Sequence, residues 1–182
     1  MRVLKLYSKI SKDNMNFNHK LMNNNYTNKD IGAVKKFLKN KDIILTQSKK
    51  VEEFEKKWSK WLGVKYSTFV NSGSSANFIT ISILKAINKN KKKNEIIVPS
   101  LTWVSDINSV IMNGFKPIFV DIDQTTLNLD PRKIESAITP QTTAILPVHC
   151  YGNPCETSEI QKIADRYGLK VIYDAAHCFG VQ

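Results

Sequence analysis

The chain has 182 residues, of which 42% are hydrophobic, and this is enough to bury the core of one ordinary domain. No run approaches the roughly 18 apolar residues of a membrane span, and the first twenty residues lack the apolar core of a secretory signal. The three cysteines, Cys150, Cys155 and Cys178, lack the spacing of a disulfide framework, which indicates reduced thiols. We therefore expect a cytoplasmic protein without a membrane partner.

The net charge of +11 is carried by the first half of the chain. Residues 1–93 hold 21 Lys and Arg against 6 Asp and Glu, a net +15, whereas residues 94–182 hold 6 against 10, a net −4. The basic residues are not interleaved with aromatic ones, and no nucleic-acid motif is present. We expect no nucleic-acid partner, and a basic face suits a phosphorylated small molecule better.

Two helices are predicted in the N-terminal third, after a polar, Asn-rich arm at residues 1–26. Thr27 followed by Asp30 resembles a capping box, and the apolar stripe that follows extends a helix to about residue 39. Ser48 is expected to cap a second helix, and Gly63 to end it. One side of that helix consists of Val51, Phe54, Trp58 and Trp61, and we expect the two tryptophans to lie in the core.

From residue 66 onward, short apolar strands alternate with helical segments. Strands are predicted at 66–70, 95–98, 117–120, 143–148 and 171–173, the last of them buried, and helices at about 76–87, 103–114, 131–138 and 156–167. This alternation is typical of right-handed βαβ units around a parallel sheet. The expected fold class is therefore α/β, a three-layer α/β/α arrangement with a mostly parallel central sheet.

Asp174 directly follows the last predicted strand, at the edge where open α/β sheets bind their ligands. A carboxylate at the end of a buried strand needs a cation or good hydrogen-bond donors. A protonated ring nitrogen of a cofactor would meet that need, and His177 follows three residues later. The alternative is that Asp174 only caps the next helix.

Residues 71–76, Asn-Ser-Gly-Ser-Ser-Ala, join a predicted strand to a helix N-terminus. Bare N–H groups and the hydroxyls of Ser74 and Ser75 suit a phosphate there, although a plain tight turn would have the same sequence. Trp103 comes just past the next strand and could stack on a planar ring or pack into the core. A phosphate, an aromatic face and a pyridinium nitrogen together describe pyridoxal 5′-phosphate.

Over roughly residues 25–182 the sequence resembles the DegT/DnrJ/EryC1/StrS family of sugar aminotransferases. Five ordered motifs carry the resemblance: N-S-G-S-S-A-N at 71–77, V-P-S-L-T-W-V-S at 98–105, G-F-K-P-I-F-V-D-I-D at 114–123, I-L-P-V-H-C-Y-G-N-P at 145–154 and Y-D-A-A-H-C-F-G at 173–180. The resemblance implies that residues 27–182 are the N-terminal part of the large domain of a pyridoxal-phosphate transferase of fold type I. It also implies a homodimer.

The same resemblance assigns roles to individual residues. The cofactor-binding positions that it implies are Gly73, Ser74, Ser75, Trp103, Asp174 and His177. Asp174 would hold the ring nitrogen and His177 would lie near the ring hydroxyl, which makes these two the expected catalytic residues of this chain. His149 and, loosely, Thr46 match substrate-binding positions. The family's Schiff-base lysine has no counterpart here, so we expect residues 1–182 alone to be inactive.

The activity that the resemblance implies is transfer of an amino group, with glutamate as donor, to a nucleotide-diphospho-4-keto- or 3-keto-6-deoxy sugar. The product would serve surface polysaccharide, such as the O-antigen of lipopolysaccharide. A pyridoxamine-phosphate-dependent 3-dehydratase of the same family, with histidine in place of the lysine, is the alternative, and Y-D-A-A-H favours the aminotransferase. From another class, the chain could be a non-catalytic binding protein that retains the phosphate pocket.

A metal site is not expected. The residues that could form one are His149, Cys150, Cys155, His177 and Cys178. Their spacing is not that of a structural zinc motif. Cys150 and Cys178 are more simply explained as small buried hydrophobic residues.

Overall fold

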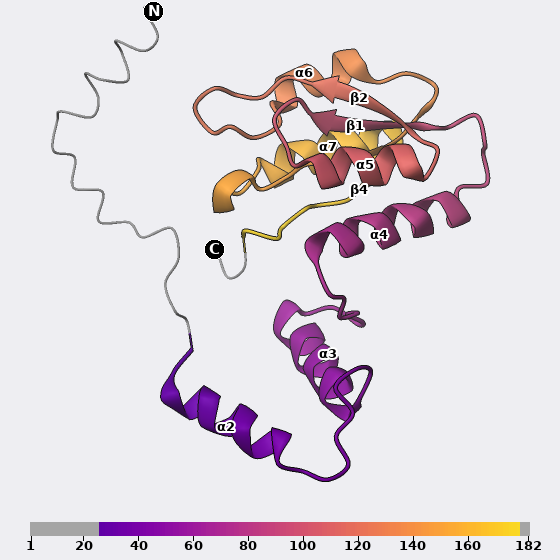
Figure 1. The fold of residues 1–182 in the computed structure, drawn as a ribbon. Coiled ribbons are helices and arrows are strands. Elements are labelled where there is room, and N and C mark those ends of the chain that lie inside the picture. The colour runs from indigo at the N-terminus through magenta and orange to yellow at the C-terminus, as the bar shows by residue number, and fades with distance from the viewer. Residues whose placement is uncertain (1–25, 179–182) are drawn as a thin grey trace, which may run out of the picture. The chain divides into compact units, whose positions relative to one another are not determined.

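The computed structural model describes residues 26–178 (Figure 1). These residues fall into two compact units, which divide between Ser67 and Thr68. Apart from residue 26, the predicted arm at 1–26 lies outside the described residues, so that prediction is not tested. No helix within residues 26–178 is long and apolar enough to cross a membrane.

The first unit contains the two predicted helices, α2 (Asn28–Leu38) and α3 (Lys49–Leu62). Thr27 and Asp30 form the capping box, because the hydroxyl of Thr27 accepts the N–H of Asp30 while the Asp30 carboxylate accepts the N–H of Thr27. Ser48 caps α3, and Gly63 ends it in the left-handed conformation. Both helix predictions are confirmed.

Of the two tryptophans of α3 that were expected in a core, Trp58 is half-buried and Trp61 is exposed, so the expectation is wrong for Trp61. Phe54 is 47% exposed and Trp61 is 59% exposed. The rings contact one another along the helix instead, with centroids 5.8 Å apart for Phe54–Trp58 and 4.9 Å apart for Trp58–Trp61. The physical reason is that α2, the other described helix of this unit, buries none of its residues, so residues 26–67 contain no second packed layer.

The second unit is a four-stranded parallel sheet with helices on both faces. Its strands are β1 (Glu95–Pro99), β2 (Lys116–Val120), β3 (Thr142–Ile145) and β4 (Lys170–Val171), in the order β2-β1-β3-β4. Its helices are α4 (Gly73–Ile87), α5 (Val104–Met112), α6 (Pro131–Ala137) and α7 (Thr157–Tyr167), with a 3₁₀ turn, η1, at Cys150–Gly152.

Two apolar cores lie on opposite faces of this sheet. All five residues of β1 are buried, and they alternate between the faces. Ile96 and Val98 pack with residues of α4 and α5, whereas Ile97 packs with residues of α6 and α7. Figure 1 shows these helices around the central strands. The predicted three-layer α/β/α fold with a parallel sheet is confirmed.

Three strand predictions need correction. The strand predicted at 143–148 is β3, which already ends at Ile145. Residues 66–70 are irregular, because none of the four described strands runs beside them and an extended segment without a partner forms no ladder. The last strand is shorter than predicted, and residues 171–173 are half-buried rather than buried, since β4 has a sheet neighbour on one side among the described strands. Asp174 nevertheless remains in register, through a parallel bridge with Val148.

Candidate functional site

The carboxyl ends of the strands bring the candidate residues of the second unit to one edge of the sheet. Trp103 follows β1, His149 follows β3 and Asp174 follows β4. The backbone fixes the last two side by side, because the carbonyl of Asp174 accepts the N–H of His149 at 3.0 Å. The N–H of Asp174 donates to the carbonyl of Pro147, also at 3.0 Å.

The Asp174 side chain is buried and receives a hydrogen bond on each oxygen. Oδ1 accepts the N–H of Ala176 at 2.9 Å, and Oδ2 accepts Nδ2 of Asn77 at 2.7 Å. Burial raises the pKa of Asp174, but the hydrogen bonds outweigh it and the pKa lies below its usual value. The carboxylate is therefore ionised at neutral pH. The described residues after it form a turn, not the helix that Asp174 was alternatively expected to cap.

Two further polar residues, which the sequence reasoning missed, complete this cluster. Nδ2 of Asn77 also donates to Oδ1 of Asp106 at 2.5 Å. Asp106 is fully buried in α5 and also accepts the hydroxyl of Thr102. Burial, with the neighbouring Asp174 carboxylate, raises the pKa of Asp106 to about 6. A signal for Asn77 was present in the sequence, because it falls on the same buried stripe of α4 as Ile81.

The predicted phosphate turn adjoins the Asp174 turn. Helix α4 begins at Gly73, earlier than predicted, because the hydroxyl of Ser72 caps it by accepting the N–H of Ser75 at 3.2 Å. Ser74 and Ser75 therefore lie in the first helical turn. The N–H groups of Gly73 and Ser74 have no intrahelical acceptor in such a turn. A Cβ atom at Gly73 would lie 3.5 Å from Cβ of Ala176, so the two turns are in contact.

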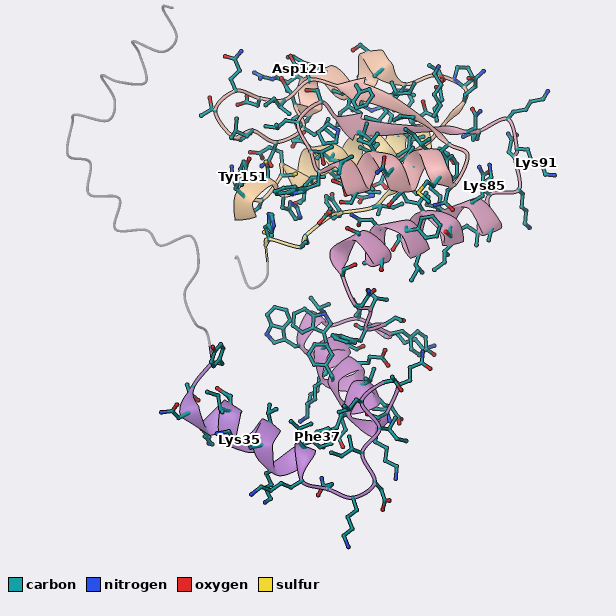
Figure 2. All side chains as sticks on the ribbon, in the orientation of Figure 1. Lys35, Phe37, Lys85, Lys91, Asp121 and Tyr151 are labelled. Carbon is teal, nitrogen blue, oxygen red and sulfur yellow. The ribbon has the colours of Figure 1, made fainter. Side chains whose placement is uncertain are left out.

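Trp103 and His177 meet at the same edge. Their ring centroids lie 5.4 Å apart with the planes at 88°, and Trp103 remains 49% exposed. The turn that carries His177 comes close to Gly152, because a Cβ atom there would lie 2.8 Å from the His177 carbonyl oxygen. Glycine at 152, with φ +84°, permits this approach. Tyr151, beside it, projects into solvent and is 70% exposed (Figure 2).

His149 is buried and already bonded at one nitrogen. Its Nδ1 accepts the N–H of Cys155 at 3.0 Å, and its ring stacks on Tyr173 with centroids 5.3 Å apart. Burial lowers the pKa of His149, although the charge of Asp174 opposes this. The imidazole is therefore neutral, with its proton on Nε2. Its substrate-binding role stays a prediction.

The other substrate candidate, Thr46, belongs to the first unit and lies in an exposed bend between α2 and α3. Its role also stays a prediction. Within residues 26–178, no group of three or more His, Cys, Asp or Glu residues is arranged to hold a metal ion.

Comparison of sequences shows which proteins this chain is similar to. The sequence model of the DegT/DnrJ/EryC1/StrS aminotransferase family matches residues 24–182. A dTDP-4-amino-4,6-dideoxy-D-glucose transaminase of Escherichia coli is 48% identical over 130 residues, which are 71% of this chain and 33% of that protein. The spore coat polysaccharide biosynthesis protein SpsC of Bacillus subtilis (strain 168) is 41% identical over 133 residues, 73% of this chain and 33% of that protein. The chain thus spans about a third of the length of these relatives.

Comparison of structures gives a similar result. A crystal structure of GDP-4-keto-6-deoxymannose-3-dehydratase "with a trapped PLP-glutamate geminal diamine" superposes with a TM-score of 0.82. The two sequences are 33% identical, and the superposition covers 91% of this chain and 43% of that one. The similarity therefore extends over both described units but over less than half of the other protein.

Proposed function

Because this chain belongs to the DegT/DnrJ/EryC1/StrS aminotransferase family, we propose that it forms the cofactor-binding part of a sugar aminotransferase that uses pyridoxal 5′-phosphate. The substrate that we propose is a nucleotide-diphospho-4-keto-6-deoxy sugar. The name of the E. coli relative, a dTDP-4-amino-4,6-dideoxy-D-glucose transaminase, supports this choice at 48% identity. The 3-keto isomer is the less supported variant.

The observation that carries the proposal is the ionised, buried carboxylate of Asp174. Its oxygens accept hydrogen bonds from Ala176 and Asn77 and interact with the carboxyl group of Asp106, and a carboxylate oxygen has two lone pairs. A protonated pyridine nitrogen supplies both the donor and the positive charge that such a carboxylate favours. The residues present at this edge therefore fit the ring of pyridoxal phosphate.

The neighbouring groups suit the rest of the cofactor. The first turn of α4, with Gly73, Ser74 and Ser75, presents N–H groups and hydroxyls to a phosphate. Trp103 offers an aromatic face, and His177 lies against it, where the resemblance expects a contact to the ring hydroxyl. Bound there, the cofactor would supply the electron sink that amino-group transfer requires.

Further parts of the proposal concern the whole protein. We propose glutamate as the amino donor, a homodimer in the cytoplasm, and a product used in surface polysaccharide such as the O-antigen of lipopolysaccharide. The name of the B. subtilis relative, a spore coat polysaccharide biosynthesis protein, agrees with a polysaccharide role. The Schiff-base lysine is expected outside these 182 residues, so residues 1–182 alone should not turn over substrate.

The test uses protein expressed from its complete reading frame. Titration with pyridoxal 5′-phosphate should quench tryptophan fluorescence with saturation, and inorganic phosphate should compete. Asp174→Ala should weaken binding of the cofactor without weakening binding of phosphate. Incubation with dTDP-4-keto-6-deoxyglucose and glutamate should then yield an amino sugar detectable by mass spectrometry. A wild-type protein that does not bind pyridoxal phosphate would contradict the proposal.

The second candidate is the 3-dehydratase of the same family. The superposition on GDP-4-keto-6-deoxymannose-3-dehydratase, with a TM-score of 0.82, favours it. The product separates the two, because the dehydratase would yield a keto-sugar that has lost one hydroxyl group instead of an amino sugar. Cofactor binding by the complete protein without either product would leave the non-catalytic binding protein.

A further inference from the structure

We propose that Asn77 and Asp106 are positioning residues that fix the direction of the Asp174 carboxylate toward a bound cofactor. This inference rests on the proposed function and deepens it, since it adds two residues to the same site. Neither side chain is exposed, because Asn77 is 7% exposed and Asp106 is fully buried. Both would act through Asp174.

The side-chain amide of Asn77 donates hydrogen bonds to two carboxylates. Its NH₂ group has two protons, and its nitrogen lies 2.7 Å from Oδ2 of Asp174 and 2.5 Å from Oδ1 of Asp106. Asn77 is itself buried, with 7% of its surface exposed. An amide held between two acceptors cannot rotate without losing a buried hydrogen bond, so it holds Oδ2 of Asp174 in one direction.

Asp106 connects the same hydrogen-bond network to the segment that contains Trp103. Its carboxylate accepts the hydroxyl of Thr102, the residue before Trp103, at the start of α5. Asn77 belongs to α4, four residues after the Gly73 that begins the candidate phosphate turn. One buried network therefore joins the three pieces that face the cofactor: the first turn of α4, the Trp103 segment and the Asp174 turn.

This hydrogen-bond network is unfavourable if it serves only to stabilise the fold. Two carboxylates share one amide in the protein interior, and Asp106 has no exposed surface at all. The ion pairs among the described residues lie elsewhere, so no salt bridge compensates either carboxylate. Although burial opposes it, hydrogen bonds and the nearby charge of His177 lower the pKa of Asp174, so the cost falls on Asp106, a buried carboxylate that is destabilising compared with an apolar residue of similar volume. A cationic ring nitrogen beside Asp174 would offset that penalty. The raised pKa of Asp106 agrees with this reading.

The test compares two ligands of the complete protein. One is pyridoxal 5′-phosphate, and the other is its analogue with carbon in place of the ring nitrogen, which cannot donate to Asp174. The ratio of the two affinities, from quenching of tryptophan fluorescence, isolates the contact with Asp174. Asn77→Leu should lower this ratio about tenfold or more, as loss of a hydrogen bond to a charged group implies. Affinity for the analogue should stay within about twofold, because that ligand lacks this contact.

Controls distinguish positioning from general damage. Asn113→Leu is the matched variant, because Asn113, the C-cap of α5, also links α5 to α4, through Ser82 and Phe78. Asn113→Leu should leave the ratio of the two ligand affinities unchanged. Asp106→Asn keeps the shape and removes the charge, so it serves if Asn77→Leu fails to fold, and it should lower the ratio at least about threefold.

Two outcomes would overturn the inference. The first is an unchanged ratio in both Asn77→Leu and Asp106→Asn. The second is an equal loss of affinity for both ligands, which would mean that the residues only maintain the fold. Failure of the proposed function is distinct from either, because the wild-type protein itself would then bind neither ligand or bind both equally.

Discussion

The indole of Trp103 and the imidazole of His177 stand almost perpendicular, at 88°, with ring centroids 5.4 Å apart. Two rings from residues 74 positions apart in the chain thus meet at the turn that follows Asp174. An edge contact of this kind covers little of either ring, and Trp103 remains 49% exposed. The indole is therefore available to a planar ligand without any rearrangement.

Trp103→Ala should weaken binding of pyridoxal phosphate about two- to thirteenfold, because an aromatic contact contributes about 0.5–1.5 kcal/mol. Calorimetric titration is the suitable measurement, since the variant loses a fluorophore. The control is Tyr167→Ala at the end of α7, which removes an aromatic ring that is 41% exposed. Equal losses in the two variants would argue against stacking at Trp103.

Gly152→Ala should disturb the turn that carries His177. The new Cβ would lie 2.8 Å from the His177 carbonyl oxygen, and residue 152 has φ +84°. Gly168→Ala is the matched control, because Gly168 has φ +63° but no atom within 4 Å of the new Cβ. Both variants should lose about 1–2 kcal/mol of unfolding free energy from the left-handed backbone. Only Gly152→Ala should in addition weaken cofactor binding. Equal effects on binding would contradict the close approach.

Asp106→Asn should change how stability depends on pH. The pKa of Asp106 is raised from 3.8 to about 6 by burial and by Asp174, so its contribution to stability is present below pH 3.8 and lost as pH rises through 6. The unfolding free energy of the variant relative to wild type should therefore increase by roughly 2–3 kcal/mol between pH 4 and pH 7.

Denaturant titrations of both proteins at several pH values provide the measurement. Asp174, whose pKa is lowered, loses its contribution only below its usual range, and its coupling to Asp106 is part of the expected difference, whereas His149 is present in both proteins. Parallel curves for variant and wild type across this interval would show that Asp106 ionises normally.

The three cysteines should differ in reactivity. Cys155 is buried, its Sγ donates to the carbonyl of Val148 at 3.1 Å, and burial raises its pKa to about 12. Burial also raises the pKa of Cys150, whereas Cys178 is half-buried on the turn after Asp174. Because the thiolate is the reactive form, iodoacetamide at pH 8 should label Cys178 first and Cys155 last. Peptide mass spectrometry measures the order, and urea should abolish it. Early labelling of Cys155 in native protein would be the contrary result.

Local patterns predicted most of the second unit. The buried stretch of β1 and the Asp130-Pro131 start of α6 depend on neighbouring residues alone, so the sequence indicated them correctly. Residues 66–70 have the same apolar character as β1, yet they form no strand, because strand formation also depends on a partner. Sequence periodicity holds no information about that partner.

The candidate site was predictable where a residue follows a strand, and not where it acts from inside a helix. Trp103 and Asp174 were found because strand ends gather at one edge. Asn77 and Asp106 lie within α4 and α5, and their contact depends on how two helices pack on the same face of the sheet. The closeness of Gly152 to His177 was missed for the same reason, since it joins two loops from different strands.

The hydrogen bond between Asn77 and Asp174 joins residues that are 97 positions apart. Contacts of such long range form late, because the entropy of closing the loop is lost before the contact contributes. During synthesis, α4 leaves the ribosome well before Asp174 does. The side-chain amide of Asn77 therefore lacks its Asp174 acceptor until β4 has docked on β3. The edge that we assign to the cofactor is thus completed only after the other described strands have formed. A ligand that depends on Asp174 can stabilise the finished sheet, but it cannot guide its assembly.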